Sequence, residues 1–428
     1  MKKVFTILLG IALILPLYSQ ETEKKEFDFT RHVFEIGFDA GVWLDNGLTP
    51  LSDIFRKKIE IDIFKLAQGI PENGAGMNFG LSADFFFNIK NIKIGTGLWD
   101  FGFIAGIDGG VGMNIPQSLF TLIAKGNAGQ KNSSGKISAS GGIFTELGLK
   151  GSAKYEVKER TLYVGLKPAI YTPAVYIPSN TGITYRLNTE RKKDDGTGTE
   201  EGLFLKTEGG INLYTPTSLE RIEPGRFIIG PSSGFDLSLE GEYALFPFLD
   251  IGGGFSNIPL APATLTNRMR LRLVDKNDPD KDFEFELSGV EGGDLKDPPE
   301  LDFAKDYDTN VKKGVYRPFR FDVYALYRPL NSNLLVIRPN IGFSVNVNKG
   351  DEKGYFNAGL EARLNLINIF TLYIGSGYKE EVWRQKAGLG VNLRAFELDI
   401  EAALRDPTFD GCFKGRCLDF NLGLRFGW

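Results

Sequence analysis

Alternating apolar residues are the feature that most constrains the fold of this chain. Its last eleven residues read LDFNLGLRFGW, and every second side chain is large and apolar. A strand places alternate side chains on opposite faces. One face of this segment therefore requires an apolar medium, and the other requires water or polar partners. The apolar positions are Leu418, Phe420, Leu422, Leu424, Phe426 and Trp428.

The same alternation recurs along much of the chain. It is clear in FDVYALY (321–327), YFNAGLEARL (355–364), GLGVNL (388–393) and AFELDIEAAL (395–404). Segments of about ten alternating residues separated by turns are typical of a transmembrane β-barrel. A soluble sandwich shows similar alternation. The barrel is favoured because the last strands follow one another as hairpins, the polar faces combine charge with Gly and Asn, and the chain stops on an aromatic strand.

The first twenty residues predict export. Lys2 and Lys3 precede an apolar run from Val4 to Leu17, and a relaxed cleavage site follows before Gln20. We interpret residues 1–19 as a signal peptide. An uncleaved anchor is the alternative, but the run is shorter than the roughly 20 residues of a spanning helix. Residues 20–75 then form a plug or the first strands, and residues 76–428 form the barrel.

The C-terminal strand resembles the signal by which bacterial outer-membrane barrels are recognised for insertion, with Phe426 and Trp428 as its aromatic residues. By pattern, the chain resembles outer-membrane barrels of spirochaetes. Its length and early helical segments resemble the long-chain fatty-acid outer-membrane transporter family. The resemblance implies an outer-membrane location in contact with lipid, recognition of the last strand by the barrel-assembly machinery, and an N-terminal plug. The plug motif has no residue-by-residue match, so none of that family's functional residues is carried over.

We therefore expect an all-β fold, a transmembrane antiparallel β-barrel of about 14 strands within a range of roughly 12 to 16. Short helical insertions are expected near the N-terminus. Thr49 and Pro50 are suited to begin one helix, and Ser118 is suited to cap a second that ends at Gly126. These helices could form a plug, or they could be turn helices or a small lobe. The polar stretches 188–202 and 290–314 are expected to be outer loops.

Two charged rows stand out in the interior of the chain. A turn at Asp278–Pro279 would form a hairpin in which a basic row faces an acidic row, and opposite charges across strands stabilise by roughly 0.2–1 kcal/mol a pair. The rows could select solutes, or they could be a self-neutralised ladder in the lumen or above the membrane. Charges near the C-terminus are expected in the lumen too, because lipid excludes them. The lumen candidates are Arg268, Arg270, Arg272, Asp282, Glu284, Glu286, Glu397, Asp399, Glu401 and Arg425.

Two cysteines lie close together between the last two strands. Exported proteins meet oxidising chemistry, so we predict a structural disulfide between Cys412 and Cys417, with two free thiols as the alternative. Metal binding is disfavoured because His32 is the only histidine and two thiolates alone make a poor zinc site. No metal, cofactor or catalytic residue is predicted, because no nucleophile or carboxylate pair can be matched to His32.

Prolines interrupt the segment PAIYTPAVYIPSN. Pro168, Pro173 and Pro178 each remove a ladder hydrogen bond. They predict a strand end, a bulge or a bend. A more specific hypothesis is a gap in the barrel wall that opens sideways to lipid. Interfacial aromatic girdles are predicted for Tyr163, Tyr171, Tyr176, Tyr185, Tyr214, Trp383 and Trp428.

The leading functional hypothesis is passive transport of small solutes, with hydrophobic solutes among the candidates. The alternative is a structural or adhesive surface protein with a closed lumen and functional outer loops. An enzyme is not expected. Nucleic acid is not expected as a partner either, because the net charge is −4.

Overall fold

The computed structural model describes residues 33–47, 68, 70, 74–125, 132–192, 199–218, 230, 232–288, 300–366, 369–414 and 416–428. The predicted signal peptide 1–19, His32, the predicted helix after Thr49 and Gly126 lie outside these residues. Of the N-terminal segment 20–75, residues 34–46 form a strand of the barrel.

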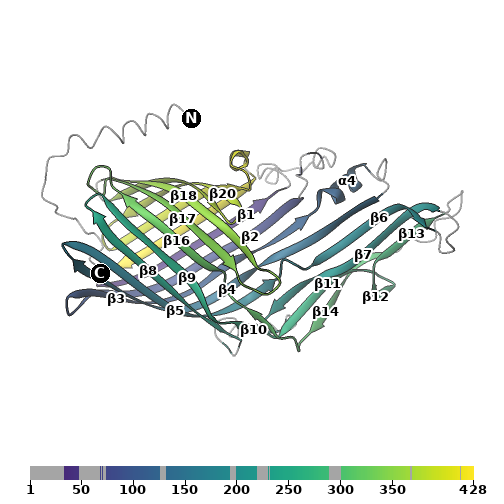
Figure 1. Cartoon of the computed structure of the whole chain (residues 1–428), viewed down its shortest axis with the longest axis horizontal. Coiled ribbons are helices and arrows are strands. Elements are labelled where there is room, and N and C mark those ends of the chain that lie inside the picture. Colours follow the sequence, from purple (N-terminus) through teal and green to yellow (C-terminus); the bar gives the residue numbers. More distant parts are fainter. Residues whose placement is uncertain are drawn as a thin grey trace.

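A continuous ring of antiparallel strand pairs forms the barrel, and the pairing of the last strand with the first closes it (Figure 1). In ring order, the strands are β1 (Phe34–Asn46), β2 (Ala75–Ile94), β3 (Gly97–Ile115), β4 (Asn132–Val157), β5 (Arg160–Ile177), β8 (Gly234–Phe246), β9 (Leu249–Ala261), β16 (Phe319–Tyr327), β17 (Leu335–Asn346), β18 (Lys353–Leu366), β19 (Phe370–Lys379), β20 (Val382–Asn392), β21 (Phe396–Asp406) and β22 (Cys417–Gly427).

Two more strands, β6 (Gly182–Lys192) and β7 (Thr199–Thr215), insert between β4 and β5 at one end of the barrel. The first part of β4 pairs with β6, β6 pairs with β7, and β7 meets β5 at the pair Tyr176–Tyr214. Counted with these strands, the barrel has sixteen, rather than the predicted value of about 14. The prediction was low because the charged stretch that joins β6 to β7 hides the alternation of both strands.

Short turns gather at one end of the ring. The β4–β5 turn consists of Lys158 and Glu159, with φ of 50° and 63°, as expected of a two-residue hairpin loop. Trp428 lies at the same end, where its backbone N–H donates to the Phe34 carbonyl. Short turns mark the periplasmic end of an outer-membrane barrel. The longer connections, including the one that holds β6 and β7 and the one that holds the strands between residues 263 and 315, leave from the opposite end.

The sheet of the ring continues beside β4 into an extension, here called the outer sheet (Figure 1). It comprises β6, β7, β11 (Asn267–Asp275), β12 (Asp278–Asp282), β13 (Glu284–Ser288) and β14 (Leu301–Asp308). The predicted outer loops 188–202 and 290–314 are therefore partly strand: residues 188–192, 199–202 and 301–308 belong to β6, β7 and β14. The prediction failed there because charge on one face of a strand resembles the composition of a loop.

The barrel wall has an apolar outer face and a polar inner face, as the alternation predicts. Large apolar side chains on the outer face are exposed, including Leu149 at 64%, Ile374 at 61% and Phe356 at 57%. Charged residues of the same strands form ion pairs on the inner face. A closed antiparallel barrel with this distribution is the architecture of bacterial outer-membrane proteins. The chain is accordingly an integral outer-membrane protein.

Aromatic rings on the inner face lie over glycines of neighbouring strands. A Cβ atom on Gly80 would lie 1.8 Å from a ring carbon of Trp43, and one on Gly388 would lie 2.2 Å from Cζ of Tyr373. These glycines are therefore required by close approach rather than by backbone conformation. Such contacts fix the register of the strands that line the lumen.

Helical structure is short among the described residues: α4 (Gln117–Lys125) follows β3, and the 3₁₀ helix η3 (Asp410–Lys414) precedes β22. The helix predicted near Ser118 is present, but Ser118 is not its cap. α4 begins at Gln117, and the Ser118 hydroxyl contacts the Ser134 carbonyl and the Tyr185 hydroxyl instead. In the part of the chain that the structure describes, no helix is long and apolar enough to span a membrane.

Candidate functional site: the lumen and its strap

An ion-pair network lines the inner face of the last strands. Arg384 of β20 lies 2.7 Å from Asp419 of β22 and also pairs with Glu401 of β21. Lys386 lies 2.5 Å from Glu361 and 3.1 Å from Glu401. The network crosses β18, β20, β21 and β22, so its members share the concave side of the sheet.

Several predicted lumen residues surround a cavity of about 230 Å³ beside this network. Asp39, Asp84, Tyr373, Asp399, Glu401 and Arg425 are among the residues that line it. The Arg425 guanidinium lies 3.7 Å from the Glu397 carboxylate and 3.9 Å from that of Asp39. The side chains come from β1, β2, β19, β21 and β22, which can converge only inside the ring.

The basic row Arg268, Arg270 and Arg272 lies on β11 of the outer sheet, outside the ring. Its principal partner is β14, not the acidic strand that follows it in sequence, since Arg268 pairs with Asp308 (3.3 Å) and Arg272 with Asp306 (2.7 Å). Of the predicted acidic row, Asp282 alone contacts the basic row in the described residues, 3.1 Å from Arg272.

The rest of the predicted acidic row pairs elsewhere. Glu284 and Glu286 belong to β13, which pairs with β7 rather than with β11, opposite Lys206 and Phe204. The predicted hairpin does not bring the two charged rows together, because β12 pairs with β11 only at the last two residues of β11, at Val274–Asp282 and Asp275–Asp278.

The proline-rich segment lies in β5, at a break in the wall. The ladder between β5 and β8 ends at the pair Tyr171–Gly234. Beyond it, β5 has one pair with β7, at Tyr176. The β4–β5 ladder also shifts register where Phe144 pairs with Pro173. The prolines therefore mark a bulge and the point where two neighbouring ring strands separate.

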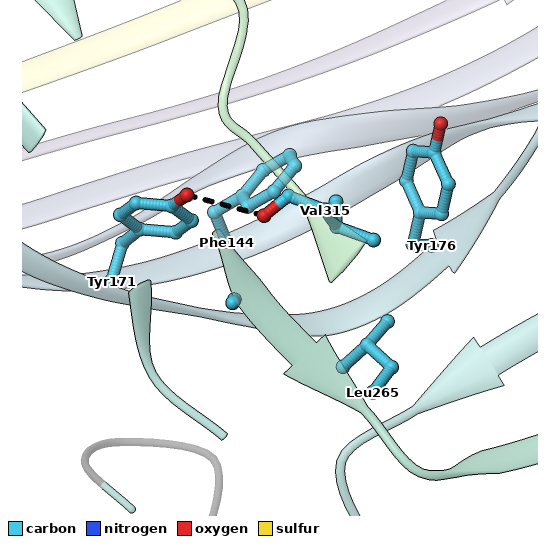
Figure 2. Packing of buried hydrophobic residues seen from close by; sticks show 6 residues of the cluster. Phe144, Tyr171, Tyr176, Leu265 and Val315 are labelled. Carbon is cyan, nitrogen blue, oxygen red and sulfur yellow. Dashed lines mark hydrogen bonds between the residues drawn. The ribbon is translucent and has the colours of Figure 1, made fainter. Parts of the chain in front are cut away.

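A short two-stranded sheet fills the place where β5 and β8 separate. It consists of β10 (Ala263–Leu265) and β15 (Lys313–Val315). We call residues 263–265 and 313–317 the strap. Phe144, Tyr171 and Tyr176 of the ring pack against Ala263, Leu265 and Val315, and all six are buried (Figure 2). The Tyr171 hydroxyl, which is fully buried, donates to the carbonyls of Val315 and Ala261, each at 3.1 Å.

Arg317 fastens the end of the strap to the inner face. Its guanidinium binds Asp236 of β8 through two hydrogen bonds, of 2.7 Å and 2.8 Å, and it also binds Glu146 of β4. The guanidinium lies 5.2 Å from the centre of the Tyr171 ring. Arg317 is 8% exposed and Asp236 is 1% exposed. A buried bidentate pair of this kind fixes orientation strongly.

The connection between β17 and β18 holds the strap from the other side. Asn348 accepts a hydrogen bond from the Tyr316 backbone N–H (2.7 Å) and donates to the Tyr316 carbonyl (2.9 Å). Asp351 of the same connection accepts from the Tyr176 hydroxyl at 2.9 Å. The strap therefore bridges β5 and the β17–β18 connection across the outer end of the lumen.

Tyr163, Tyr171 and Tyr176 do not belong to an interfacial girdle. Tyr163 donates to Glu240, and the other two pack in the strap cluster. The girdle prediction was wrong for them because each faces inward, where its hydroxyl finds a polar partner. Sequence analysis also missed Arg317, Glu146 and Asp236. The prolines of β5 were the one signal that indicated this part of the wall.

The predicted disulfide is absent, since Cys412 and Cys417 are both free and buried. The Cys412 thiol of η3 points to the carbonyls of Trp383 (3.4 Å) and Thr408 (3.7 Å). The Cys417 sulfur, at the start of β22, accepts from the Asn46 backbone N–H at 3.3 Å. The prediction was wrong because the 3₁₀ turn directs one thiol toward β20 and the other lies against β1.

No protein-family model and no curated protein matches the chain. Among solved structures, it is similar to the toluene transporter TbuX of Ralstonia pickettii, with 10% identity, a TM-score of 0.39, and coverage of 97% of this chain and 91% of that one. It is also similar to the CymD monoaromatic hydrocarbon channel, with 9% identity, a TM-score of 0.43, and coverage of 93% of this chain and 89% of that one. A third similar structure is a Pseudomonas aeruginosa FadL homologue, with 7% identity, a TM-score of 0.37, and coverage of 92% of this chain and 90% of that one.

Proposed function

We propose that this barrel transports small solutes passively across the outer membrane, and that the strap closes its path in the conformation described above. The observation that carries the proposal is the strap itself. A segment of the chain fills the place where β5 and β8 separate, and it is fastened there by side chains rather than by a continuous ladder. A barrel with only a structural role could complete this part of its wall with a continuous ladder instead.

The chemistry on the two sides of the strap indicates the solute class. Phe144, Tyr171 and Tyr176 would line the opening that is left when the strap moves. This opening lies in the wall, where the surrounding medium is lipid. We therefore propose small hydrophobic solutes that leave the barrel sideways at the β5–β8 seam. The ion pairs among β18, β20 and β21 favour this route, because an apolar solute would meet charge along the axis.

Uptake into liposomes tests this proposal. Benzene uptake by the purified protein is compared with that of Tyr171→Phe, which removes the two hydrogen bonds to the strap region. We expect faster uptake by this variant. Tyr163→Phe is the matched control, since this tyrosine of the same strand binds Glu240 and not the strap. Equal uptake by wild type and Tyr171→Phe would count against the strap as a gate.

The bulge is tested separately. Pro173→Ala would restore a backbone N–H at the point where the β4–β5 register shifts, so the strand could pair more regularly and narrow the opening. We expect lower benzene uptake by Pro173→Ala, with the folded state checked by heat-dependent gel mobility. Unchanged uptake by this variant would contradict the hypothesis that solutes leave the barrel sideways.

The alternative function is a surface protein whose lumen stays closed. The outer sheet favours it, because β6, β7, β11 and β14 extend beyond the ring and β11 and β14 carry the ion pairs of Arg268 and Arg272. A wild-type protein that passes neither ions nor benzene in liposomes, and whose Tyr171→Phe variant remains closed, would favour this second function.

A further inference from the structure

The outer sheet contains a pocket that the transport path does not use. Its volume is about 530 Å³, within the range of small-molecule sites. We propose that it binds an oxyanion carried on a hydroxyl-rich group, that is, a phosphorylated or carboxylated sugar. This inference goes beyond the proposed transport function and does not depend on it.

The pocket lies on the face of the outer sheet that continues the inner face of the ring. Lys136 and Glu146 both belong to β4 and share one face, because the β4–β6 ladder over residues 132–138 and the β3–β4 ladder over residues 138–154 have no register shift. Lys136 pairs with Thr184 of β6, and Asn212 of β7 pairs with Arg270 of β11. Paired residues lie on the same face of a sheet.

Glycines shape the floor of the pocket. Gly182 pairs with Gly210 across β6 and β7. A Cβ on Gly182 would lie 2.6 Å from Cε of Lys136, and one on Gly210 would lie 2.9 Å from Nε of Arg270. The absence of side chains at these positions lets the two cationic chains lie flat across the sheet, one on each side of the pocket.

The charge of the lining is positive. Lys136, Arg268 and Arg270 line the pocket, and Glu208 is the carboxylate among the lining residues. The Lys136 ammonium donates to the Asn180 carbonyl (3.0 Å), and Arg268 lies 3.3 Å from Asp308. Within the described chain, Arg270 forms neither an ion pair nor a side-chain hydrogen bond. A partly buried guanidinium in this state is suited to an oxyanion, which it can bind through two parallel N–H groups.

Two buried polar atoms of the lining also lack partners. They are Nε of Arg268, which is a donor, and Oδ1 of Asn212, which is an acceptor. A buried unsatisfied polar group is unfavourable unless a ligand or water completes its bonding. An acceptor beside the donors indicates that the ligand carries hydroxyl groups as well as a negative charge. Thr181, Thr184 and Asn180 add further polar groups of the kind that bind sugar hydroxyls.

Isothermal titration of the full chain in detergent tests this inference. Glucose 6-phosphate is the probe, and glucose and inorganic phosphate separate the two parts of its chemistry. Lipid A in mixed micelles presents the same phosphosugar chemistry as a lipid headgroup. We expect glucose 6-phosphate to bind and glucose to bind much more weakly. Stronger binding of lipid A than of glucose 6-phosphate would assign the site to a headgroup, and the reverse would assign it to a soluble sugar.

Arg270→Gln is the decisive variant. Loss of a charge-assisted hydrogen bond is expected to weaken binding by about tenfold or more. Arg270→Lys keeps the charge but loses the planar fork, so its binding should be intermediate. The matched control is Arg186→Gln, which removes an exposed cation from β6 outside the pocket. The inference is refuted if wild type binds none of the probes, if glucose binds as well as its phosphate, or if folded Arg270→Gln and Arg186→Gln behave alike.

Discussion

Replacing Arg317 with Met tests most directly whether the strap is a gate. Asp236 is 1% exposed, and Arg317 is its ion-pair partner in the described structure. Glu146 would keep Lys167 at 2.9 Å. Leaving one buried carboxylate without its partner costs about 3–5 kcal/mol. Because Glu146 remains paired, we place the effect at the lower end, about 3 kcal/mol.

This energy favours displacement of the strap, because Asp236 regains water when the strap leaves. About 3 kcal/mol corresponds to roughly a hundredfold increase in the population with the strap displaced. Conductance in planar bilayers and benzene uptake in liposomes should both rise in Arg317→Met. Trypsin cleavage at Lys313 of the strap should become faster in parallel.

Two further variants isolate the cause. Arg328→Met removes the partner of Asp250, which lies 2.6 Å away in the ring, and should leave conductance unchanged. Adding Asp236→Asn to Arg317→Met removes the unpaired charge and should restore part of the closure. If folded Arg317→Met conducts no more than wild type, the strap is a fixed part of the wall and the gating argument is wrong.

Four other predictions follow from the geometry. Burial, with a smaller effect from the Asp406 carboxylate, raises the pKa of the Cys412 thiol to about 11. Maleimide should therefore label this thiol slowly at pH 8 until the protein unfolds. Fast labelling of the native protein would contradict this prediction. The raised pKa keeps the Cys412 thiol neutral in the folded state. Its contribution to the free energy of unfolding is therefore complete below pH 9, its ordinary pKa, and is lost as the pH rises toward 11. In Cys412→Ser, the free energy of unfolding should fall less between pH 9 and pH 11 than in wild type. Gly388→Val would clash with Tyr373 and should destabilise the barrel by roughly 1–3 kcal/mol, measured by urea unfolding, whereas Gly151→Val, with open space around its Cβ, should not. Phe426→Asp should reduce heat-modifiable barrel in membranes if the last strand is the insertion signal, and normal assembly of Phe426→Asp and Trp428→Ala together would remove that role.

Local alternation predicted much of this barrel. Phe356, Leu360 and Leu364 face outward at 57%, 45% and 37% exposure, as the two-residue period requires. Their polar neighbour Glu361 pairs with Lys386 on the inner face. The period is a property of the backbone and needs no knowledge of partners. The bilayer then permits one arrangement, in which the apolar row faces lipid and every backbone group is paired within a closed wall.

Partners far apart in sequence were decided by tertiary structure. β11 is compatible with any strand that offers acidic residues in register. It pairs along eight residues with β14, whereas it pairs with the nearer β12 at two positions. Arg317 meets Asp236 across 81 residues and Glu146 across 171 residues. Conversely, residues that are close in sequence need not be partners. Cys412 and Cys417 are five positions apart, yet both thiols are free.

The sequence by itself thus determined the two faces of each strand, and hence an outer-membrane cylinder with a polar lumen. The tertiary structure alone decided which strands are neighbours, where β5 and β8 separate, and which segment fills that place. The physical reason is that facing direction follows from a two-residue repeat within one strand, whereas pairing and strap position follow from the summed packing of segments that meet only after the chain has closed.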